Sequence, residues 1–446
     1  MVLARLGMRI PNLLMLRCRP KGGLEARGTV VPPSRPGFAG HLRMRMLGVS
    51  AGAAGLAITL MSGTAFAQYS DDVVRLGILT DLSGPYADSG GKGSVAAAEM
   101  AVKDFGGTVK GKKVEVISAD HQNKPDVAST IARKWFDVDK VDAVLDLPVT
   151  AIALAAQQVA KEKNRTVMIT AAATSDFTSK LCNPVSSHWT DDTQALTAGT
   201  ARAVFERGGK SWYFITVDHA FGQALQRDAA AVVEKLGGKV VGASRFPIGN
   251  ADFSSFLLSA QSSGADVVAF AAVGDDFSRA IKQANEFGLM AGKQTMTGFL
   301  VYITDINALG LPVAQNLNFS EAFYWDQNEA TRAFAKRFFD QIGIMPTKNH
   351  ALIYTATTHF LKAADKAGTD EAVAVNKAMR TTPVSFFGRD ATLRADGRLL
   401  YDPVLYRVKT PAQSKAPWDY YEAVRTIPAA EAFLPMNPAC ANSSPG

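Results

Sequence analysis

Short apolar segments alternate with amphipathic ones along most of this chain, and this alternation constrains the fold more than any other feature. Runs of five to eight residues rich in Val, Ile and Leu, such as Val73–Leu79 and Ser211–Val217, recur from residue 73 to residue 299. Between them lie segments such as Gln194–Arg207, in which apolar residues follow the helical period. Short buried strands that alternate with helices are typical of parallel sheets covered on both faces.

The expected elements form two successive sets, at about 73–190 and 211–323. The strands are expected at Val73–Leu79, Val114–Ser118, Val141–Leu145, Thr166–Thr170, Ser211–Val217, Val240–Phe246, Ala265–Ala272, Thr295–Phe299 and, later, Pro403–Lys409. The helices are expected at Ser94–Phe105, Val127–Phe136, Ala151–Lys163, Gln194–Arg207, Gln223–Leu236, Asp276–Phe287, Glu329–Ile342 and His350–Ala367. The sequence therefore predicts an α/β protein with two doubly wound parallel-sheet lobes and a ligand between them.

A leader segment precedes the first of these elements. Met46–Ala67 is uncharged, follows Arg43 and Arg45, and ends in the small-x-small pattern Ala65-Phe66-Ala67. These features predict a signal peptide within residues 1–67, cleaved after Ala67, and a periplasmic mature protein. An uncleaved membrane anchor is the alternative, because the segment is long enough to span a bilayer although weakly apolar. Residues 1–43 are either an upstream extension from a mis-assigned start or a long leader, and lie outside the expected fold.

The charge of the mature chain argues against nucleic acid as a partner. The full sequence has a formal net charge of +7, but residues 1–67 hold nine of its 48 basic residues and one of its 41 acidic residues. The remainder is therefore nearly neutral, at about −1, and has no basic excess to attract phosphates. No second hydrophobic span follows residue 67, so the mature protein is not expected to be embedded in a membrane.

Three cysteines occur, and Cys18 belongs to the leader. The other two, Cys182 and Cys440, are expected to form one disulfide in an oxidising compartment, with two free thiols as the alternative.

The chain lacks the spacings of a metal, nucleotide or catalytic site. Its six histidines are scattered, with no HxxxH or CxxC pattern. The glycine-rich Gly90–Ser94 fails the phosphate-loop pattern, because Tyr86 stands where a glycine is needed and Gly93 follows Lys92. No nucleophile elbow is present. We therefore expect no cofactor or metal, and a binding protein rather than an enzyme.

Three expected strand-to-helix turns are rich in small and hydroxyl residues: Asp81–Tyr86, Leu147–Ala151 and Thr170–Ser175. Small residues let backbone N–H groups approach a ligand, and the hydroxyls of Thr150 and Thr174 stand at helix starts. Each turn alone is as well explained by ordinary helix capping. Together, at one sheet edge, they indicate a site for a carboxylate.

The same residues carry a family resemblance. Val74–Tyr86, Thr170–Thr174, Asp218–Gly222 and Asp252–Phe256 resemble motifs of the branched-chain amino-acid-type (type I) periplasmic binding proteins of ABC importers. The resemblance implies two lobes joined by three hinge crossovers, and delivery of a small solute to an inner-membrane ABC permease. It divides the chain into a first lobe, 71–192 plus 325–380, and a second lobe, 193–324 plus 381–446.

The resemblance also implies a set of ligand contacts. The ligand carboxylate should meet Thr150 or Ala151, the backbone at Ala172, and Thr174. From the facing lobe, Phe221 matches the aromatic residue of the family motif. Near the first-lobe turn, Tyr86 adjoins the site and Ser89 leaves more room than the aromatic residue often found there.

One departure from the family pattern bears on the ligand. Where amino-acid binders place an acid that holds the ligand ammonium, this chain has Phe299, although Asp275 or Asp276 could take that role from the neighbouring loop. Trp325 lies about where a hinge is expected, and either packs there or contacts ligand. With Phe221 and Tyr302, these rings favour an aromatic or apolar carboxylic acid. An amino acid is the alternative ligand, and a ligand-sensing regulator or an exported enzyme is an alternative function.

Overall fold

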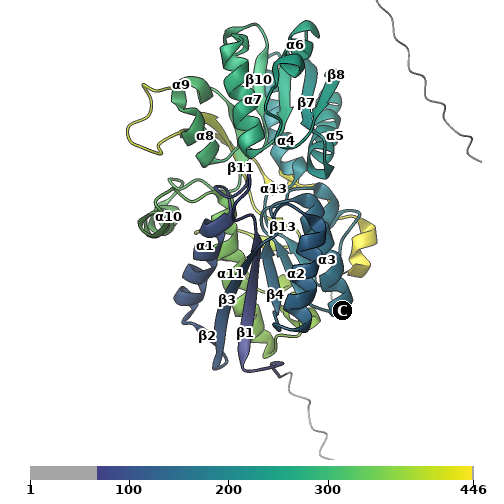
Figure 1. The fold of residues 1–446 in the computed structure, drawn as a ribbon, viewed down its shortest axis with the longest axis vertical. Helices are drawn as coiled ribbons and strands as arrows, with labels where there is room; N and C mark the ends of the chain where they lie inside the picture. The colour runs from purple at the N-terminus through teal and green to yellow at the C-terminus, as the bar shows by residue number, and fades with distance from the viewer. Residues whose placement is uncertain (1–67, 444–446) are drawn as a thin grey trace, which may run out of the picture. The chain divides into compact units, whose positions relative to one another are not determined.

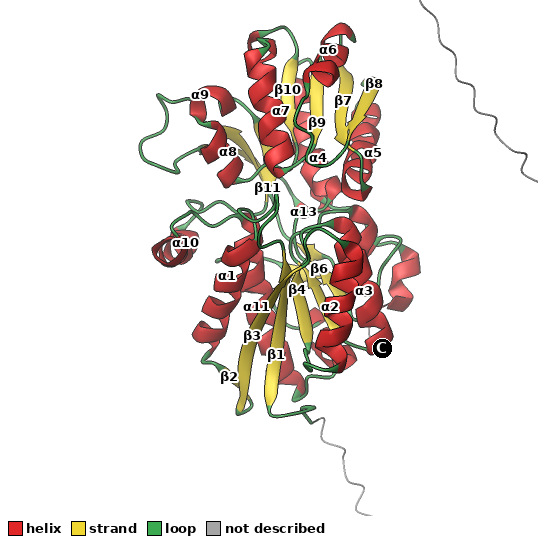
Figure 2. Cartoon of the chain, viewed as in Figure 1, coloured by secondary structure: helices red, strands yellow, loops and turns green. Residues whose placement is uncertain are grey.

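Two parallel sheets, each at the centre of one lobe, dominate the computed structural model, which describes residues 68–443 (Figures 1 and 2). The two-lobed α/β architecture predicted from the sequence is confirmed. The predicted leader and its cleavage after Ala67 lie outside the described residues. Within 68–443, none of the helices is both long and apolar enough to cross a bilayer.

The first lobe is built on a six-stranded sheet in the order β2-β3-β1-β4-β5-β6. Its strands are β1 (Val73–Thr80), β2 (Thr108–Val109), β3 (Lys112–Asp120), β4 (Ala143–Asp146), β5 (Thr166–Ile169) and β6 (Ser186–His188). Every neighbouring pair is parallel except the short antiparallel pair β2–β3. The carboxyl ends of the five parallel strands therefore share one edge, which is where open α/β sheets bind ligands.

Helices cover both faces of this sheet, because the central strand β1 carries buried apolar side chains on both faces. Val74, Leu76 and Ile78 share one core cluster with α1 and α11, while Leu79 lies in another with α2 and α3. At Gly77 a Cβ would come within 2.6 Å of the Trp135 ring, so this position requires glycine. The covering helices are α1 (Gly91–Phe105), α2 (Pro125–Asp137), α3 (Thr150–Lys163), α10 (Glu329–Ile342), α11 (Lys348–Ala367) and α12 (Ala372–Arg380).

The second lobe contains a four-stranded parallel sheet in the order β10-β9-β7-β8. Its strands are β7 (Ser211–Val217), β8 (Lys239–Phe246), β9 (Val267–Ala271) and β10 (Thr295–Gly298). Its helices are α4 (Thr193–Glu206), α5 (Ala220–Lys235), α6 (Ser254–Ser262), α7 (Gly274–Glu286), α8 (Ile303–Leu309) and α9 (Leu311–Ala314).

A third, antiparallel sheet, β11-β14-β15, forms late in the chain, beside a two-stranded pair β12–β13. These elements are β11 (Asn318–Glu321), β12 (Thr392–Leu393), β13 (Leu399–Leu400), β14 (Val404–Val408) and β15 (Tyr421–Thr426), followed by α13 (Ala429–Ala432). Of these strands, only β14 was expected. The sequence of β11, Asn-Phe-Ser-Glu, has no apolar alternation that would predict a strand. Its Ser320 is buried and makes a polar contact with Thr200 of α4.

Part of the C-terminal segment packs on the first lobe, although the expected division gave 381–446 to the second lobe, in whose core cluster Tyr406, Val408 and Tyr421 do lie. Phe386, Leu399 and Tyr401 lie in the core cluster of the first lobe, and Phe433 returns to pack on Tyr401 with ring centroids 5.3 Å apart. These apolar side chains lie there because they cover first-lobe core residues that the elements of 68–190 leave exposed to solvent. The expected disulfide, Cys182–Cys440, is present and fixes this tail to the first lobe across 258 residues of sequence.

Asp191 lies where the chain leaves the first lobe, and its buried carboxylate joins the other connections between the lobes. Lys348 Nζ and the Ala322 N–H donate to its Oδ2 over 2.8 and 3.1 Å, and the Tyr401 hydroxyl donates to its Oδ1 over 2.8 Å. The Asp191 and Lys348 side chains are each 1% exposed. Burial raises the pKa of nearby Glu321 well above its usual range, whereas Asp191 forms the direct ion pair with Lys348.

A second buried carboxyl, Asp146, ends β4 beneath the loop that leads into α3. Asp146 and Leu147 have φ angles of 80° and 64°, in the left-handed region that non-glycine residues rarely adopt. Neither Asp146 side-chain oxygen has a hydrogen-bond partner among the described residues. Burial raises its pKa to about 6, and the nearby hydroxyls of Thr80 and Ser94 oppose that rise only in part. The segment that leads into α3 thus contains strained backbone at Asp146 and Leu147 and a buried Asp146 carboxyl that lowers stability when it is charged.

Replacing Asp191 by asparagine should destabilise the protein strongly. Asp191→Asn keeps the side-chain size but leaves Lys348 buried without its charged partner, so we expect the free energy of unfolding to fall by about 3–5 kcal/mol. Denaturant unfolding with the disulfide intact measures this. The matched control is Asp340→Asn, which breaks an exposed pair with Lys336 and should cost less than about 1 kcal/mol. Equal losses in the two variants would show that the buried pair has no special weight.

Replacing Asp146 by asparagine should change how stability depends on pH. The folded pKa is about 6 against a usual 3.8, so the folded state holds the proton more tightly and wild-type stability falls as pH rises from about 4 to about 6. The Asp146→Asn variant has no carboxyl at this position, so its stability does not fall for this reason as pH rises. Asparagine also tolerates a positive φ. Thermal unfolding should therefore show a variant advantage of up to about 3 kcal/mol at pH 7 that vanishes near pH 4.

The exposed Asp390 provides the control for this pH dependence. Asp390→Asn measures the effect of the same substitution at an exposed site over the same pH range. If the difference in unfolding free energy between Asp146→Asn and the wild type stays constant over this pH range, the raised pKa assigned to Asp146 is wrong.

Candidate binding site

A small cavity lies between the lobes, at the carboxyl ends of strands from both sheets. We call it the inner cavity, and it is lined by Tyr86, Ser89, Pro148, Val149, Thr150, Ala171, Ala173, His219, Phe221, Val273, Leu300 and Tyr302. Its volume is about 20 Å³. Such a volume holds little more than one water, so the walls of the two lobes lie close together here.

The N-terminus of α3 forms the polar part of the first-lobe wall. Thr150 is the first residue of this helix, and Val149 at the N-cap provides no side-chain cap. The Thr150 side chain is buried, and its Oγ1 has no hydrogen-bond partner among the described residues. A helix start with uncapped N–H groups and a free hydroxyl is a suitable site for an anionic oxygen.

The second-lobe wall is mostly apolar, with rings and a histidine. Phe221 and Tyr302 are 5% and 3% exposed, and the Tyr302 hydroxyl accepts a hydrogen bond from Asn349 Nδ2 over 3.1 Å. His219, the residue before α5, has a buried Nε2 without a partner among residues 68–443. Burial lowers the His219 pKa, so its imidazole is neutral at pH 7. None of the residues lining the inner cavity is therefore charged at that pH.

The lobes touch at the mouth of this cavity, where α7 begins. Gly274, at the start of α7, has a φ of 62°, and a Cβ there would lie 3.0 Å from the Pro85 carbonyl oxygen and 3.5 Å from the Tyr86 ring. Glycine at this position thus permits both the turn into α7 and the close approach of the first lobe.

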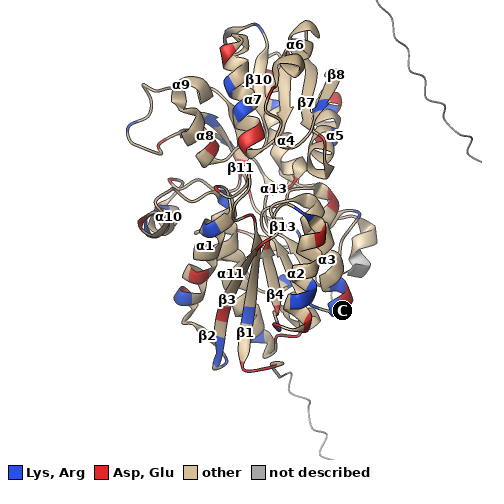
Figure 3. Cartoon of the chain, in the orientation of Figure 1, with Lys and Arg blue, Asp and Glu red and all other residues tan. Residues whose placement is uncertain are grey.

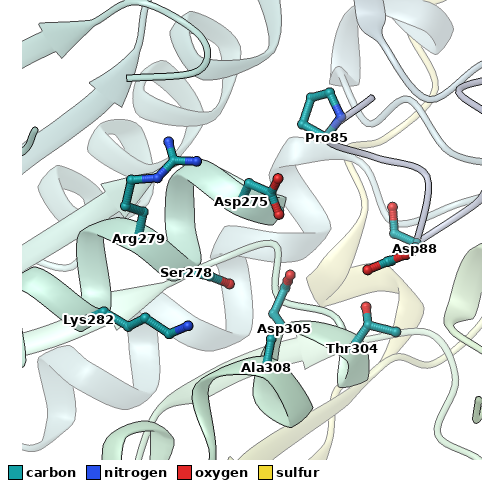
Figure 4. Close-up of a pocket in the computed structure, with 11 residues that line it drawn as sticks. Pro85, Asp88, Asp275, Ser278, Arg279, Lys282, Thr304, Asp305 and Ala308 are labelled. Atoms are coloured by element: carbon teal, nitrogen blue, oxygen red, sulfur yellow. The ribbon is translucent and has the colours of Figure 1, made fainter. Parts of the chain in front are cut away.

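A second, charged pocket of about 340 Å³ lies outside this contact (Figure 4). We call it the outer pocket, and it is lined by Pro85, Asp88, Ser89, Gly274, Asp275, Ser278, Arg279, Lys282, Thr304, Asp305 and Ala308. Burial, with smaller contributions from the carboxylates of Asp275 and Asp88, raises the Asp305 pKa to about 7 against the opposing hydrogen bond from the Tyr302 N–H. Ser89 lines both spaces, so the neutral inner cavity and the charged outer pocket adjoin.

Four of the residues proposed from the sequence line the inner cavity: Tyr86, Ser89, Thr150 and Phe221. Asp275 instead lines the outer pocket. Ala151 follows Thr150 in the first turn of α3 without lining the cavity.

The other proposed contacts are occupied elsewhere. The Ala172 N–H donates to the Leu147 carbonyl over 3.1 Å, and Ala171 and Ala173 line the cavity in its place. The Thr174 hydroxyl caps a short 3-10 helix by accepting from the Asp176 N–H over 3.3 Å.

The two aromatic residues Phe299 and Trp325 also point away from the inner cavity. Phe299 is fully buried and stacks with Trp212, ring centroids 6.4 Å apart, in the second-lobe core. Trp325 Nε1 donates to the Trp418 carbonyl over 2.8 Å, as expected of hinge packing rather than ligand contact.

His219 and the apolar residues Pro148, Val149, Val273 and Leu300 were not proposed from the sequence. His219 lies inside the Asp218–Gly222 motif that was recognised, but nothing in the motif indicated which ring atom would lack a partner. The apolar residues follow β4, β9 and β10 at the same sheet edges, and their position after those strands was the available signal.

Charges elsewhere are dispersed. Figure 3 shows acidic and basic positions interspersed over the outer helices and strand ends. Within residues 68–443, no group of three or more His, Cys, Asp or Glu residues is arranged to hold a metal ion.

Comparison with known structures shows close similarity to periplasmic binding proteins. One from Burkholderia mallei is 42% identical, with a TM-score of 0.80 over 81% of this chain and 96% of that one. A branched chain amino acid ABC transporter periplasmic ligand-binding protein from Burkholderia xenovorans LB400 is 39% identical, with a TM-score of 0.74 over 81% and 97%. A solute binding protein from Rhodopseudomonas palustris BisB5, in complex with 3,4-dihydroxy benzoic acid, shares the fold at 20% identity, with a TM-score of 0.73 over 80% and 98%.

Curated relatives point the same way. Leu/Ile/Val-binding protein homolog 6 of Brucella abortus is 29% identical over 258 residues, which are 57% of this chain, and the chain spans 65% of that protein's length. A family model described as "Periplasmic binding protein" matches residues 73–415, across both lobes. The resemblance to branched-chain amino-acid-type (type I) members is confirmed, and the chain belongs to the periplasmic binding protein family.

Proposed function

We propose that this chain is the periplasmic solute-binding component of an ABC importer, and that it captures a small monocarboxylate with an apolar body. The observation that carries the proposal is the uncapped start of α3, with the unpartnered Thr150 hydroxyl, facing a cavity whose other lining groups are neutral. The bound acid would then be delivered to an inner-membrane permease. The leader, cleaved after Ala67, would place the protein in the periplasm.

A carboxylate suits the first-lobe wall because charge and hydrogen bonds act there together. The N–H groups of the first turn of α3 carry the positive end of the helix dipole. The buried Thr150 hydroxyl has no partner among the described residues, and a carboxylate oxygen would accept a hydrogen bond from it. The aromatic rings of Tyr86, Phe221 and Tyr302 would pack on the body of the acid.

The neutral lining argues against a zwitterion. An ammonium group in the inner cavity would lie among apolar and neutral polar groups, and a buried charge without a partner is costly. Of the two acids considered for that role, Asp275 lines the outer pocket instead, and Asp276 accepts a hydrogen bond from the Gly249 N–H over 2.9 Å.

A branched-chain amino acid is the second candidate. The adjacency of the two pockets at Ser89 favours it, because a ligand extending outward would bring an ammonium group towards Asp275. The names of the Burkholderia xenovorans and Brucella abortus relatives agree with this candidate.

Matched ligand pairs that differ only in the ammonium group test the proposal. Thermal unfolding should be measured with 4-methylpentanoate against leucine, and with 3-phenylpropanoate against phenylalanine, since bound ligand raises the unfolding midpoint. We expect the acids without an ammonium group to raise the midpoint and the amino acids to leave it unchanged. The reverse pattern would establish the amino-acid candidate and overturn the proposal.

Removing the Thr150 hydroxyl should weaken binding of the acid. Thr150→Ala deletes a hydrogen bond to a charged group, so we expect a loss of about 1.5–3 kcal/mol, or roughly 10- to 150-fold in Kd, by calorimetry. Thr150→Ser keeps the hydroxyl and should retain most of the affinity. Thr174→Ala is the matched control, because that hydroxyl already caps a neighbouring turn. Equal losses at 150 and 174 would argue against a direct contact at Thr150.

A further inference from the structure

His219 lines the inner cavity from the wall opposite α3, and its Nε2 is buried without a hydrogen-bond partner among the described residues. The residue belongs to the second lobe, immediately before α5, whereas Thr150 starts α3 in the first lobe. Both side chains line the same cavity, and both His219 Nε2 and Thr150 Oγ1 are buried without a partner among the described residues. A ligand held by its carboxylate at α3 would therefore turn its remote end towards the second lobe and His219.

The chemistry of a neutral imidazole limits what can satisfy Nε2. The nitrogen accepts a hydrogen bond in one tautomer and donates one in the other. A hydroxyl group both donates and accepts, so it pairs with either tautomer. A methyl group or an aromatic C–H leaves Nε2 buried and unpaired, and the cost of such an unpaired group is what lets a site reject the analogue that lacks the hydroxyl.

Two of the other polar side chains that line the cavity are already hydrogen-bonded. Ser89 Oγ donates to the Tyr86 carbonyl over 3.1 Å, and the Tyr302 hydroxyl accepts from Asn349. The ring of His219 lies 6.0 Å from that of Phe221, centroid to centroid, so an aromatic surface adjoins the nitrogen. This arrangement fits a polar substituent on the edge of an otherwise apolar ligand.

We propose that His219 is a specificity-determining residue, which selects monocarboxylates that carry a hydroxyl group at the end remote from the carboxylate. The inference rests on the proposed function, since it takes the carboxylate to be held at α3. It adds the chemical class of the ligand's other end and the side chain that recognises it.

Calorimetric titration of the mature chain with three acids tests this inference. The probes are 4-hydroxybenzoate, benzoate and 2-hydroxybenzoate, whose hydroxyl is remote, absent, or beside the carboxylate. We expect the wild type to bind 4-hydroxybenzoate about 5- to 150-fold more tightly than benzoate, and 2-hydroxybenzoate no better than benzoate. Equal affinity for 4-hydroxybenzoate and benzoate, or a preference for 2-hydroxybenzoate, would overturn the inference even if no variant folds.

Two variants and a control assign the preference to His219. His219→Phe should remove the preference by weakening 4-hydroxybenzoate binding without weakening benzoate binding, and His219→Gln, which keeps a donor and an acceptor, should retain part of it. Gln223→Ala alters an exposed residue in the first turn of the same helix and should leave the preference unchanged. A folded His219→Phe that still prefers the hydroxylated acid would overturn the inference.

The two proposals fail in distinguishable ways. If the wild type binds none of these acids or the pairs used above, the carboxylate function itself is wrong. If it binds acids without discrimination, or discriminates independently of residue 219, the carboxylate function stands and the role of His219 is wrong.

Discussion

The buried carboxylate of Asp191 is the interaction on which the relation between the lobes depends. It receives hydrogen bonds from Lys348, from the backbone at Ala322 and from Tyr401, which lie in segments far apart in sequence. A buried ion pair of this kind contributes little net stability over a well-packed apolar alternative, but its loss is costly and its geometry is demanding. These hydrogen bonds hold the connections between the lobes in one arrangement. In two-lobed proteins such connections act as the hinge.

The position of the two lobes determines which groups line the binding site. A helix start from the first lobe lies near rings and a histidine from the second, and the space between them is small. Charged side chains gather outside the point of contact at Gly274, where solvent still screens them. A ligand would thus pass a charged entrance and lose its water only where neutral groups surround it.

The sequence predicted the β/α order, both parallel sheets and the disulfide, because apolar periodicity and cysteine number are local properties. It did not predict β11, whose Asn-Phe-Ser-Glu has no apolar pattern and is buried through polar contacts with α4. At the site, Thr150 and Phe221 were identifiable from turn composition and motif. The ring orientations were not, because whether Phe299 meets ligand or Trp212 depends on packing between strands that the sequence places only approximately.

The return of the C-terminal tail to the first lobe has a consequence for the order in which the protein folds. The four strands of the second-lobe sheet lie within residues 211–298, so this sheet can assemble as soon as that stretch is available. The first-lobe core needs Tyr401 and Phe433, and its covalent closure needs Cys440. Because loop closure over so long a separation is slow, a chain that crosses a membrane amino end first would hold an incomplete first lobe until its last residues emerge.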